Sequence, residues 1–210
     1  MHVSVRAVVF NGAGAGTGAT NLVALMQDGA VVAQEQLAGR GASEHFAPLT
    51  RRLLRQAGWQ DAPDRVVAVT GPGSFTGLRS SLSLAAGLAE GWSCPTYGVT
   101  LGAALRATLG RPDVTCVSVA RRGRLFVDPP AGPVVAVQTT DLDPAGWSAV
   151  AGDGVEEYSS WPCEALTCCA PTAAGIFQAS LRECPAPLRP LYVDPPEARP
   201  PTGGLRSAPQ

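Results

Sequence analysis

The sequence predicts an α/β fold of two lobes with mixed β-sheets, the second lobe reduced. First, apolar stretches at the start predict three consecutive strands, after which helical and strand patterns alternate. Second, Gly110-Arg-Pro-Asp113 interrupts this order and marks a boundary. Third, the strands that follow lie in a shorter, proline-richer half. We therefore expect a first lobe over residues 1–110 with a five-stranded sheet, a reduced lobe over 111–194, and a disordered tail over 195–210.

The first lobe opens with three antiparallel strands. Residues 3–10 predict the first strand. Leu22–Met26 and Val31–Gln36 flank Asp28-Gly29, a dipeptide typical of a two-residue hairpin. The glycine-rich turn before them contains Gly14-x-Gly16-x-x-Ala19, which imitates a dinucleotide fingerprint. That fingerprint must open a helix, and here it opens a hairpin, so we set the Rossmann interpretation aside.

A helix follows the hairpin, and its limits are visible in the sequence. Ser43 is a candidate N-cap and Gly58 a candidate C′ residue. Between them, one helical face carries the apolar residues Phe46, Leu49, Leu53 and Ala57. A buried strand is then predicted over residues 66–70.

The segment Gly71-Pro-Gly-Ser-Phe-Thr-Gly-Leu-Arg-Ser80 connects that strand to a second helix. It lacks the Gly-Lys-Ser/Thr ending of a P-loop. It is also not a G-x-S-x-G nucleophile elbow, because Ser74 lies in Gly73-Ser-Phe-Thr-Gly77. We therefore expect the loop to have a structural role, in setting the backbone path and in packing, more than a catalytic or phosphate-binding one.

The second helix, from Leu78 to Ala89, has an apolar stripe and an otherwise small-sided surface. The stripe comprises Leu78, Leu82, Ala85 and Ala89, and the small residues are Ser80, Ser81, Ser83, Ala86 and Gly87. Such a surface lets another backbone approach closely. It fits a helix–helix interface with a partner, and it equally fits a helix sandwiched within its own domain.

The remaining elements are a strand over Thr96–Val99, a short helix over Leu101–Leu109 and the second half. There we predict strands over Val114–Val119, Arg124–Val127 and Val134–Val137, a turn at Gly152-Asp-Gly154, and a helix over about Thr172–Glu183.

Composition excludes several classes of protein. The net charge of −1 gives no global attraction to nucleic acid or membrane, and lysine-based chemistry is excluded because lysine is absent. No apolar run is long enough to span a bilayer, and the first residues do not form a signal peptide, so we expect a cytoplasmic protein. The six cysteines form no C-x-x-C pair and there are two histidines, which argues against zinc.

Three places in the sequence are candidates for chemistry or binding. A Ser74–His45–carboxylate triad has nothing in the sequence to support it. The Arg121-Arg122-Gly123-Arg124 cluster fits RNA phosphates or, more simply, a solvated hairpin end. Arg79 opposes the helix dipole, so we expect a carboxylate or carbonyl partner for it, within the chain or across an interface.

Gly71-Pro-Gly-Ser-Phe-Thr-Gly-Leu-Arg79 after an apolar strand resembles the signature of the TsaB (YeaZ) family. Weaker matches extend over nearly the whole chain: Ser43-Glu-His45, Ala120-Arg-Arg-Gly123, Gly152-Asp-Gly154, Pro190-Leu-Tyr192 and Pro195-Pro-Glu-Ala198.

The resemblance implies an actin-like (ASKHA) fold and a role in making N6-threonylcarbamoyladenosine (t6A) at position 37 of tRNA. It implies an accessory subunit that pairs with a catalytic TsaD-like subunit, with a TsaE-like ATPase completing the assembly and a homodimer possible through the same helical face. We expect no catalytic residue, cofactor or metal on this chain. The partner interface is expected at Ser43, His45, Phe46, Ser74, Phe75, Thr76, Gly77, Leu78, Arg79, Ser81 and Leu82.

The chain also departs from the family pattern. Asn11 stands where an acidic residue usually ends the first strand, Val119 replaces an aspartate, and Val193-Asp194 follows the tyrosine segment. An amide cannot supply the charge that magnesium prefers, which weighs against ATP hydrolysis. The alternatives are an autonomous actin-like ATPase, a glycoprotease-type peptidase, or a stand-alone RNA-binding module. Leu78→Asp or Gly77→Trp is expected to abolish partner binding without unfolding the chain.

Overall fold

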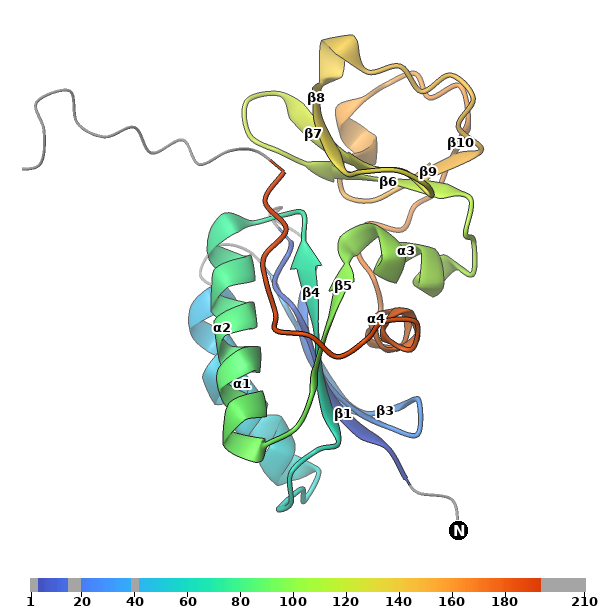
Figure 1. The fold of residues 1–210 in the computed structure, drawn as a ribbon. Coiled ribbons are helices and arrows are strands. Elements are labelled where there is room, and N and C mark those ends of the chain that lie inside the picture. Colours follow the sequence, from blue (N-terminus) through green and yellow to red (C-terminus); the bar gives the residue numbers. More distant parts are fainter. Residues whose placement is uncertain (1–3, 15–19, 39–41, 194–210) are drawn as a thin grey trace, which may run out of the picture.

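Two five-stranded sheets form the framework of the computed structural model, which describes residues 4–14, 20–38 and 42–193 (Figure 1). The first has the order β3-β2-β1-β4-β5 and the second β10-β9-β6-β7-β8. Both are mixed, and the mixed α/β prediction is confirmed. The predicted tail over 195–210 and most of the Gly14–Ala19 turn lie outside the described residues.

The first sheet begins with the predicted antiparallel meander. Its strands are β1 (Arg6–Asn11), β2 (Asn21–Gln27), β3 (Ala30–Leu37), β4 (Arg65–Gly71) and β5 (Thr96–Thr100). β2 pairs antiparallel with β1 and β3, whereas β4 pairs parallel with β1 and β5. Asp28 and Gly29 form the predicted hairpin turn with φ values of 53° and 80°, as the type I′ geometry requires.

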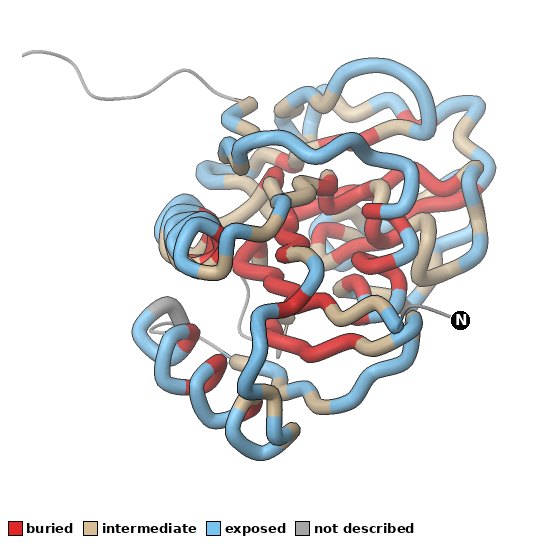
Figure 2. The backbone as a smooth tube through the Cα atoms, turned by 60° about the horizontal axis from the view of Figure 1, so that its bottom comes forward, coloured by how far each residue is buried: buried red, intermediate tan, exposed pale blue. Residues whose placement is uncertain are grey.

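Helices cover both faces of this sheet. α1 (Ala42–Gln56) and α2 (Phe75–Trp92) pack on one face, and α3 (Leu101–Leu109) and α4 (Ala173–Ser180) on the other (Figure 1). The central strands are therefore buried on both sides, which explains why Ala7–Phe10 and Val66–Val69 are continuously apolar. Figure 2 shows the buried residues concentrated along these strands and the exposed ones on the outer sides of the helices.

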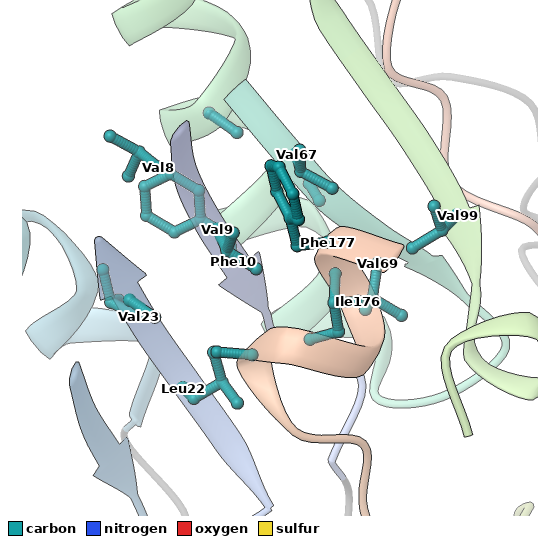
Figure 3. Close-up of a cluster of buried hydrophobic side chains, with 14 of the residues drawn as sticks. Val8, Val9, Phe10, Leu22, Val23, Val67, Val69, Val99, Ile176 and Phe177 are labelled. Atoms are coloured by element: carbon teal, nitrogen blue, oxygen red, sulfur yellow. The ribbon is translucent and has the colours of Figure 1, made fainter. Parts of the chain in front are cut away.

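The C-terminal part of the chain returns to the first sheet. Ile176 and Phe177 of α4 point into the main core (Figure 3). Leu191 N donates to Thr70 O at 2.8 Å, and Ala186 N donates to Thr96 O at 3.0 Å. The sequence predicts this segment in the second lobe (111–194), but the apolar face of α4 covers a sheet formed by residues far earlier in the chain. The helix is also shorter than predicted.

The second sheet is the smaller layer. Its strands are β6 (Val114–Val119), β7 (Arg124–Asp128), β8 (Val135–Gln138), β9 (Ala149–Ala151) and β10 (Glu164–Ala165), with short 3-10 helices at Thr139–Asp141 and Val155–Glu157. Val117, Leu125, Val127 and Val150 form its core. Trp147 and Trp161 stack beside it with ring centroids 5.9 Å apart. The three strands predicted here are confirmed to within a residue.

A buried ion pair connects the second sheet to α3. The Asp128 carboxylate, at the end of β7, accepts a hydrogen bond from the Arg106 guanidinium at 2.9 Å and another from Gly102 N at 3.2 Å. A Cβ atom at Gly102 would lie 2.3 Å from the Asp128 carboxyl carbon. Asp128 is only 4% exposed, so its negative charge has lost most of its contact with water. The positive charge of Arg106 and the N–H groups of the first turn of α3 offset the cost of burying it.

Removing one member of this pair is expected to be strongly destabilising. Asp128→Ala leaves the Arg106 guanidinium largely buried without its counter-charge, which costs about 3 kcal/mol in free energy of unfolding at pH 7. Urea titration measures the loss. Asp113→Ala, which breaks an exposed pair with Arg111, is the control and should leave the unfolding midpoint nearly unchanged. Equal midpoints for both variants would contradict this assignment.

Candidate functional site

The glycine loop before α2 packs backbone against backbone on the loop that follows β1. Ser74 N donates to Ala13 O at 2.8 Å. A Cβ atom at Gly73 would lie 2.2 Å from Ala13 O, and one at Gly77 would lie 2.3 Å from Gly12 O. Contacts this short exclude any side chain at these two glycines. The loop therefore fixes the start of α2 against β1.

Ser74 serves as the N-cap of α2. Its Oγ accepts a hydrogen bond from Gly77 N at 3.3 Å. His45, the candidate base, lies on the exposed surface of α1, and no hydrogen bond of the described residues joins it to Ser74. The serine oxygen is thus engaged in capping, and the contacts of the described residues do not assemble the triad considered above.

Asn11 is occupied by its own loop. The residue is 1% exposed, its Nδ2 donates to Thr20 O at 2.8 Å, and its Oδ1 accepts from Ala13 N at 3.0 Å. Both ends of the amide therefore hold the chain that leaves β1. An ionised aspartate could not reproduce this pattern, because it has no donor for the Thr20 carbonyl.

Asn11→Asp is accordingly expected to destabilise the fold without creating an ATPase. The new carboxylate would face the Thr20 carbonyl in a buried place, which disfavours its charged form, and we expect the free energy of unfolding to fall by about 2–4 kcal/mol at pH 8. The loss should be smaller at pH 4.5, where protonation restores a donor. Urea titrations at both pH values measure this. Unchanged stability together with new ATP turnover would contradict the assignment.

At the N-terminus of α2, Phe75 and Arg79 form a stack with Tyr192. The Arg79 guanidinium lies 3.8 Å from the centroid of the Phe75 ring, and Arg79 Nε donates to Tyr192 Oη at 2.6 Å. The two aromatic rings are 5.7 Å apart. A carboxylate or carbonyl partner for Arg79 within the chain is not found among the described residues, where the contacts are a phenol and two aromatic faces. A partner across an interface stays a prediction.

This stack borders a shallow depression on the outer side of α2. The depression has a volume of about 480 Å³, is widely open to solvent, and is lined by Phe75, Thr76, Arg79, Ser80 and Ser83. Phe75 is 49% exposed, a large fraction for an aromatic side chain on a helix. Further along the helix, exposed small residues continue the same surface at Ala86, Gly87 and Gly91.

The predicted interface residues divide by their position on the two helices. His45, Phe75, Thr76 and Arg79 are exposed, and Ser74 and Gly77 are half-buried. Four of the predicted residues are instead buried in the chain's own core: Phe46, Leu78, Ser81 and Leu82. Phe46, Leu78 and Leu82 belong to the apolar faces of their helices, and these faces are turned toward the sheet. Ser81, predicted on the small-sided surface, is buried with them, and its Oγ donates to Leu78 O. Ser43 lies in the first turn of α1, which begins at Ala42, and its side chain is outside the described part.

Tyr192 was missed as a site residue. The sequence placed it within the matched segment Pro190-Leu-Tyr192 but gave no indication of its neighbour. Its contact with Arg79 joins residues 113 positions apart in the chain, which helical or strand periodicity cannot reveal.

The basic cluster lies in the β6–β7 hairpin of the second lobe. Arg122 and Gly123 form its turn with φ values of 63° and 67°, and Arg121 and Arg122 are exposed. Arg124 Nε donates to Arg121 O at 3.4 Å. A solvated hairpin end accounts for these contacts, and RNA binding by this cluster stays a prediction.

The Gly152–Gly154 turn is confirmed and has a structural role. The Asp153 carboxylate accepts a hydrogen bond from Val119 N at 3.0 Å, and burial raises the pKa of Asp153. A Cβ atom at Gly152, whose φ is 122°, would lie 2.0 Å from Val117 O. The turn is thus packed directly against β6.

Comparison with known proteins identifies relatives of this chain. The family model for TsaD, tRNA N6-adenosine threonylcarbamoyltransferase, matches residues 30–145, more than half of the chain. An uncharacterized protein of Mycobacterium tuberculosis is 34% identical over 170 residues, which cover 77% of this chain and 79% of the relative. The tRNA threonylcarbamoyladenosine biosynthesis protein TsaB of Escherichia coli is 37% identical over 79 residues, which cover 37% of this chain and 34% of that protein.

Solved structures share the fold. YeaZ from Pseudomonas aeruginosa superposes with a TM-score of 0.70 at 22% identity, covering 90% of this chain and 99% of that one. Another solved structure, of an uncharacterized protein with similarity to peptidase YEAZ from Pseudomonas aeruginosa, gives a TM-score of 0.73 at 20% identity and covers 90% of this chain and 100% of that one. None of the helices in the described part of the chain combines the length and hydropathy that a membrane span needs. The actin-like α/β fold is confirmed, and the chain belongs to the TsaD family, within which it is a TsaB/YeaZ-like protein.

Proposed function

We propose that this chain is a non-catalytic subunit of the machinery that makes t6A on tRNA, and that it docks onto a TsaD-type catalytic subunit through the outer face of α2. The relationship to the TsaD family and to TsaB supports a role in t6A synthesis. In this proposal the tRNA is bound by the complex and not by the chain alone. A TsaE-type ATPase completes the assembly, which acts in the cytoplasm.

One observation carries the proposal: a continuous exposed stripe on α2. Phe75, Arg79, Ser83 and Ala86 recur at helical spacing, and all four are exposed. The stripe offers one large aromatic anchor followed by small side chains, a combination that lets a second helix approach closely and bury the anchor. The opposite side of α2 is already packed on β4 and β1.

The engagement of the polar groups near the glycine loop supports a non-catalytic role. Ser74 caps α2, and Asn11 fixes the loop after β1. In the described part of the chain, neither residue has a basic side chain or a carboxylate among its hydrogen-bond partners. A nucleophile or a metal–phosphate site would require such neighbours.

The experiment is a binding measurement with the TsaD-type subunit of the same genome. Size-exclusion chromatography with light scattering is expected to show a complex at about 10 μM of each protein. Because the same stripe can pair two copies of this chain, a homodimer of the isolated protein is expected to give way to the heterodimer on mixing. No complex with the wild-type chain at that concentration contradicts the proposal.

A further inference from the structure

The Arg79 guanidinium is held in place more firmly than an ordinary surface arginine. The Phe75 ring lies 3.8 Å from it and the Tyr192 ring 5.5 Å, measured from the guanidinium carbon to each ring centroid. The Nε atom is bonded to Tyr192 Oη at 2.6 Å. Two aromatic faces and one hydrogen bond restrict a side chain that would otherwise sample many rotamers.

Tyr192 is itself fixed by the segment that carries it. Thr96 Oγ1 donates to Ala186 O at 2.6 Å, and Leu191 N donates to Thr70 O at 2.8 Å, directly before Tyr192. The final described residues are therefore tied along β5 and the end of β4. This attachment brings the phenol to the first turn of α2, where Arg79 lies.

Arg79 forms no ion pair within the described part of the chain, and α2 has no acidic residue in its first turn. The helix N-terminus adds a positive partial charge at the same end. With Nε committed to Tyr192, the two terminal nitrogens keep the parallel N–H pair that matches a carboxylate.

We infer that the Phe75–Arg79–Tyr192 stack receives a carboxylate side chain of the TsaD-type subunit, with Tyr192 as the residue that positions Arg79. The inference rests on the proposed function and specifies the chemistry of the partner surface: an acidic residue beside an apolar residue that covers Phe75. Such an arrangement combines a charge-assisted hydrogen bond with burial of the exposed ring.

An RNA phosphate fits this place less well than a protein carboxylate. Arg79 is the only cation among the five residues that line the depression. Nucleic-acid backbones are bound by several cations along a track, and the other lining groups here are one aromatic ring and three hydroxyls. The basic hairpin Arg121–Arg124 joins two strands of the second sheet, and none of its residues lines the depression.

The test is isothermal titration of the full-length chain with the TsaD-type subunit at several NaCl concentrations. Arg79→Gln is expected to raise Kd about tenfold or more and to flatten its dependence on salt. Arg79→Lys should restore the salt dependence but only part of the affinity, because lysine lacks the planar fork. Tyr192→Phe should raise Kd about threefold and keep the wild-type salt dependence, since the charge remains but loses its fixed position.

Arg182→Gln, an exposed arginine beyond α4, is the matched control and should leave Kd unchanged. Thermal unfolding should be the same for all four variants within about 2 °C, so the salt dependence separates a charge contact from a structural defect. Wild-type affinity and salt dependence for Arg79→Gln would overturn this inference alone. No binding by the wild-type chain would overturn the proposed function with it. Binding of tRNA by the isolated chain that is lost in Arg79→Gln would reassign the stack to RNA.

Discussion

Ala86→Arg is expected to abolish the complex with the TsaD-type subunit while the chain remains folded. Ala86 is exposed and lies on the same stripe of α2 as Phe75, Arg79 and Ser83. A small side chain there allows a partner helix to approach closely, and arginine adds both bulk and a charge that must be buried without a counter-charge. We expect Kd to rise by more than about 100-fold, measured by isothermal titration.

The chain offers a matched control for this substitution. Ala174 is also an exposed helical alanine, but it lies on α4, which packs on the opposite face of the first sheet. Ala174→Arg should bind with wild-type affinity. Arginine is a good helix former, so both variants should keep the wild-type melting temperature to within a few degrees. Wild-type affinity for Ala86→Arg would place the interface elsewhere on the molecule.

Gly77→Trp and Leu78→Asp are expected to unfold the chain, contrary to what the sequence predicted for them. A Cβ atom at Gly77 would lie 2.3 Å from Gly12 O, so any larger side chain separates α2 from the loop after β1. Leu78 is 1% exposed, and an aspartate there buries an unpaired charge. Each substitution should cost about 4 kcal/mol or more, a large share of the stability of a domain.

Gly87→Ala on the same helix is the control for this prediction. A Cβ atom at Gly87 meets nothing within 4 Å, so alanine should stabilise the helix by about 0.5–1 kcal/mol. Urea titration followed by circular dichroism compares these variants. A folded Gly77→Trp protein with the wild-type midpoint would show that the close packing of Gly77 on Gly12 has been assigned wrongly.

Most of the fold follows from local sequence signals. Asp28-Gly29 sets the first hairpin, and the continuous apolar runs over Ala7–Phe10 and Val66–Val69 indicate strands covered on both faces. The position of α4 could not be predicted in this way. Its buried face packs on strands of the first sheet, which lie far earlier in the chain, and nothing near Thr172 indicates which sheet it covers.

The sequence locates the candidate site on α2 but does not show which face of the helix is exposed. Helical periodicity identifies the apolar stripe of α2, yet it does not say which face a partner covers, and Leu78 and Leu82 were therefore assigned to the wrong side. The exposed surface is marked by Phe75 and by the small residues that follow it. Tyr192 completes that surface through a contact that only the folded chain creates.

In our proposal the chain supplies a docking surface and leaves the chemistry to its partner. The most direct measurement is t6A formation on tRNA by a reconstituted mixture of this chain with TsaD-type and TsaE-type subunits, a threonylcarbamoyl donor and ATP. We predict full activity with the wild-type chain and with Ser74→Ala, near-background activity with Ala86→Arg, and no ATP or peptide turnover by the chain alone. Wild-type t6A formation with Ala86→Arg, or turnover by the isolated chain that Ser74→Ala removes, would show that this proposal is wrong.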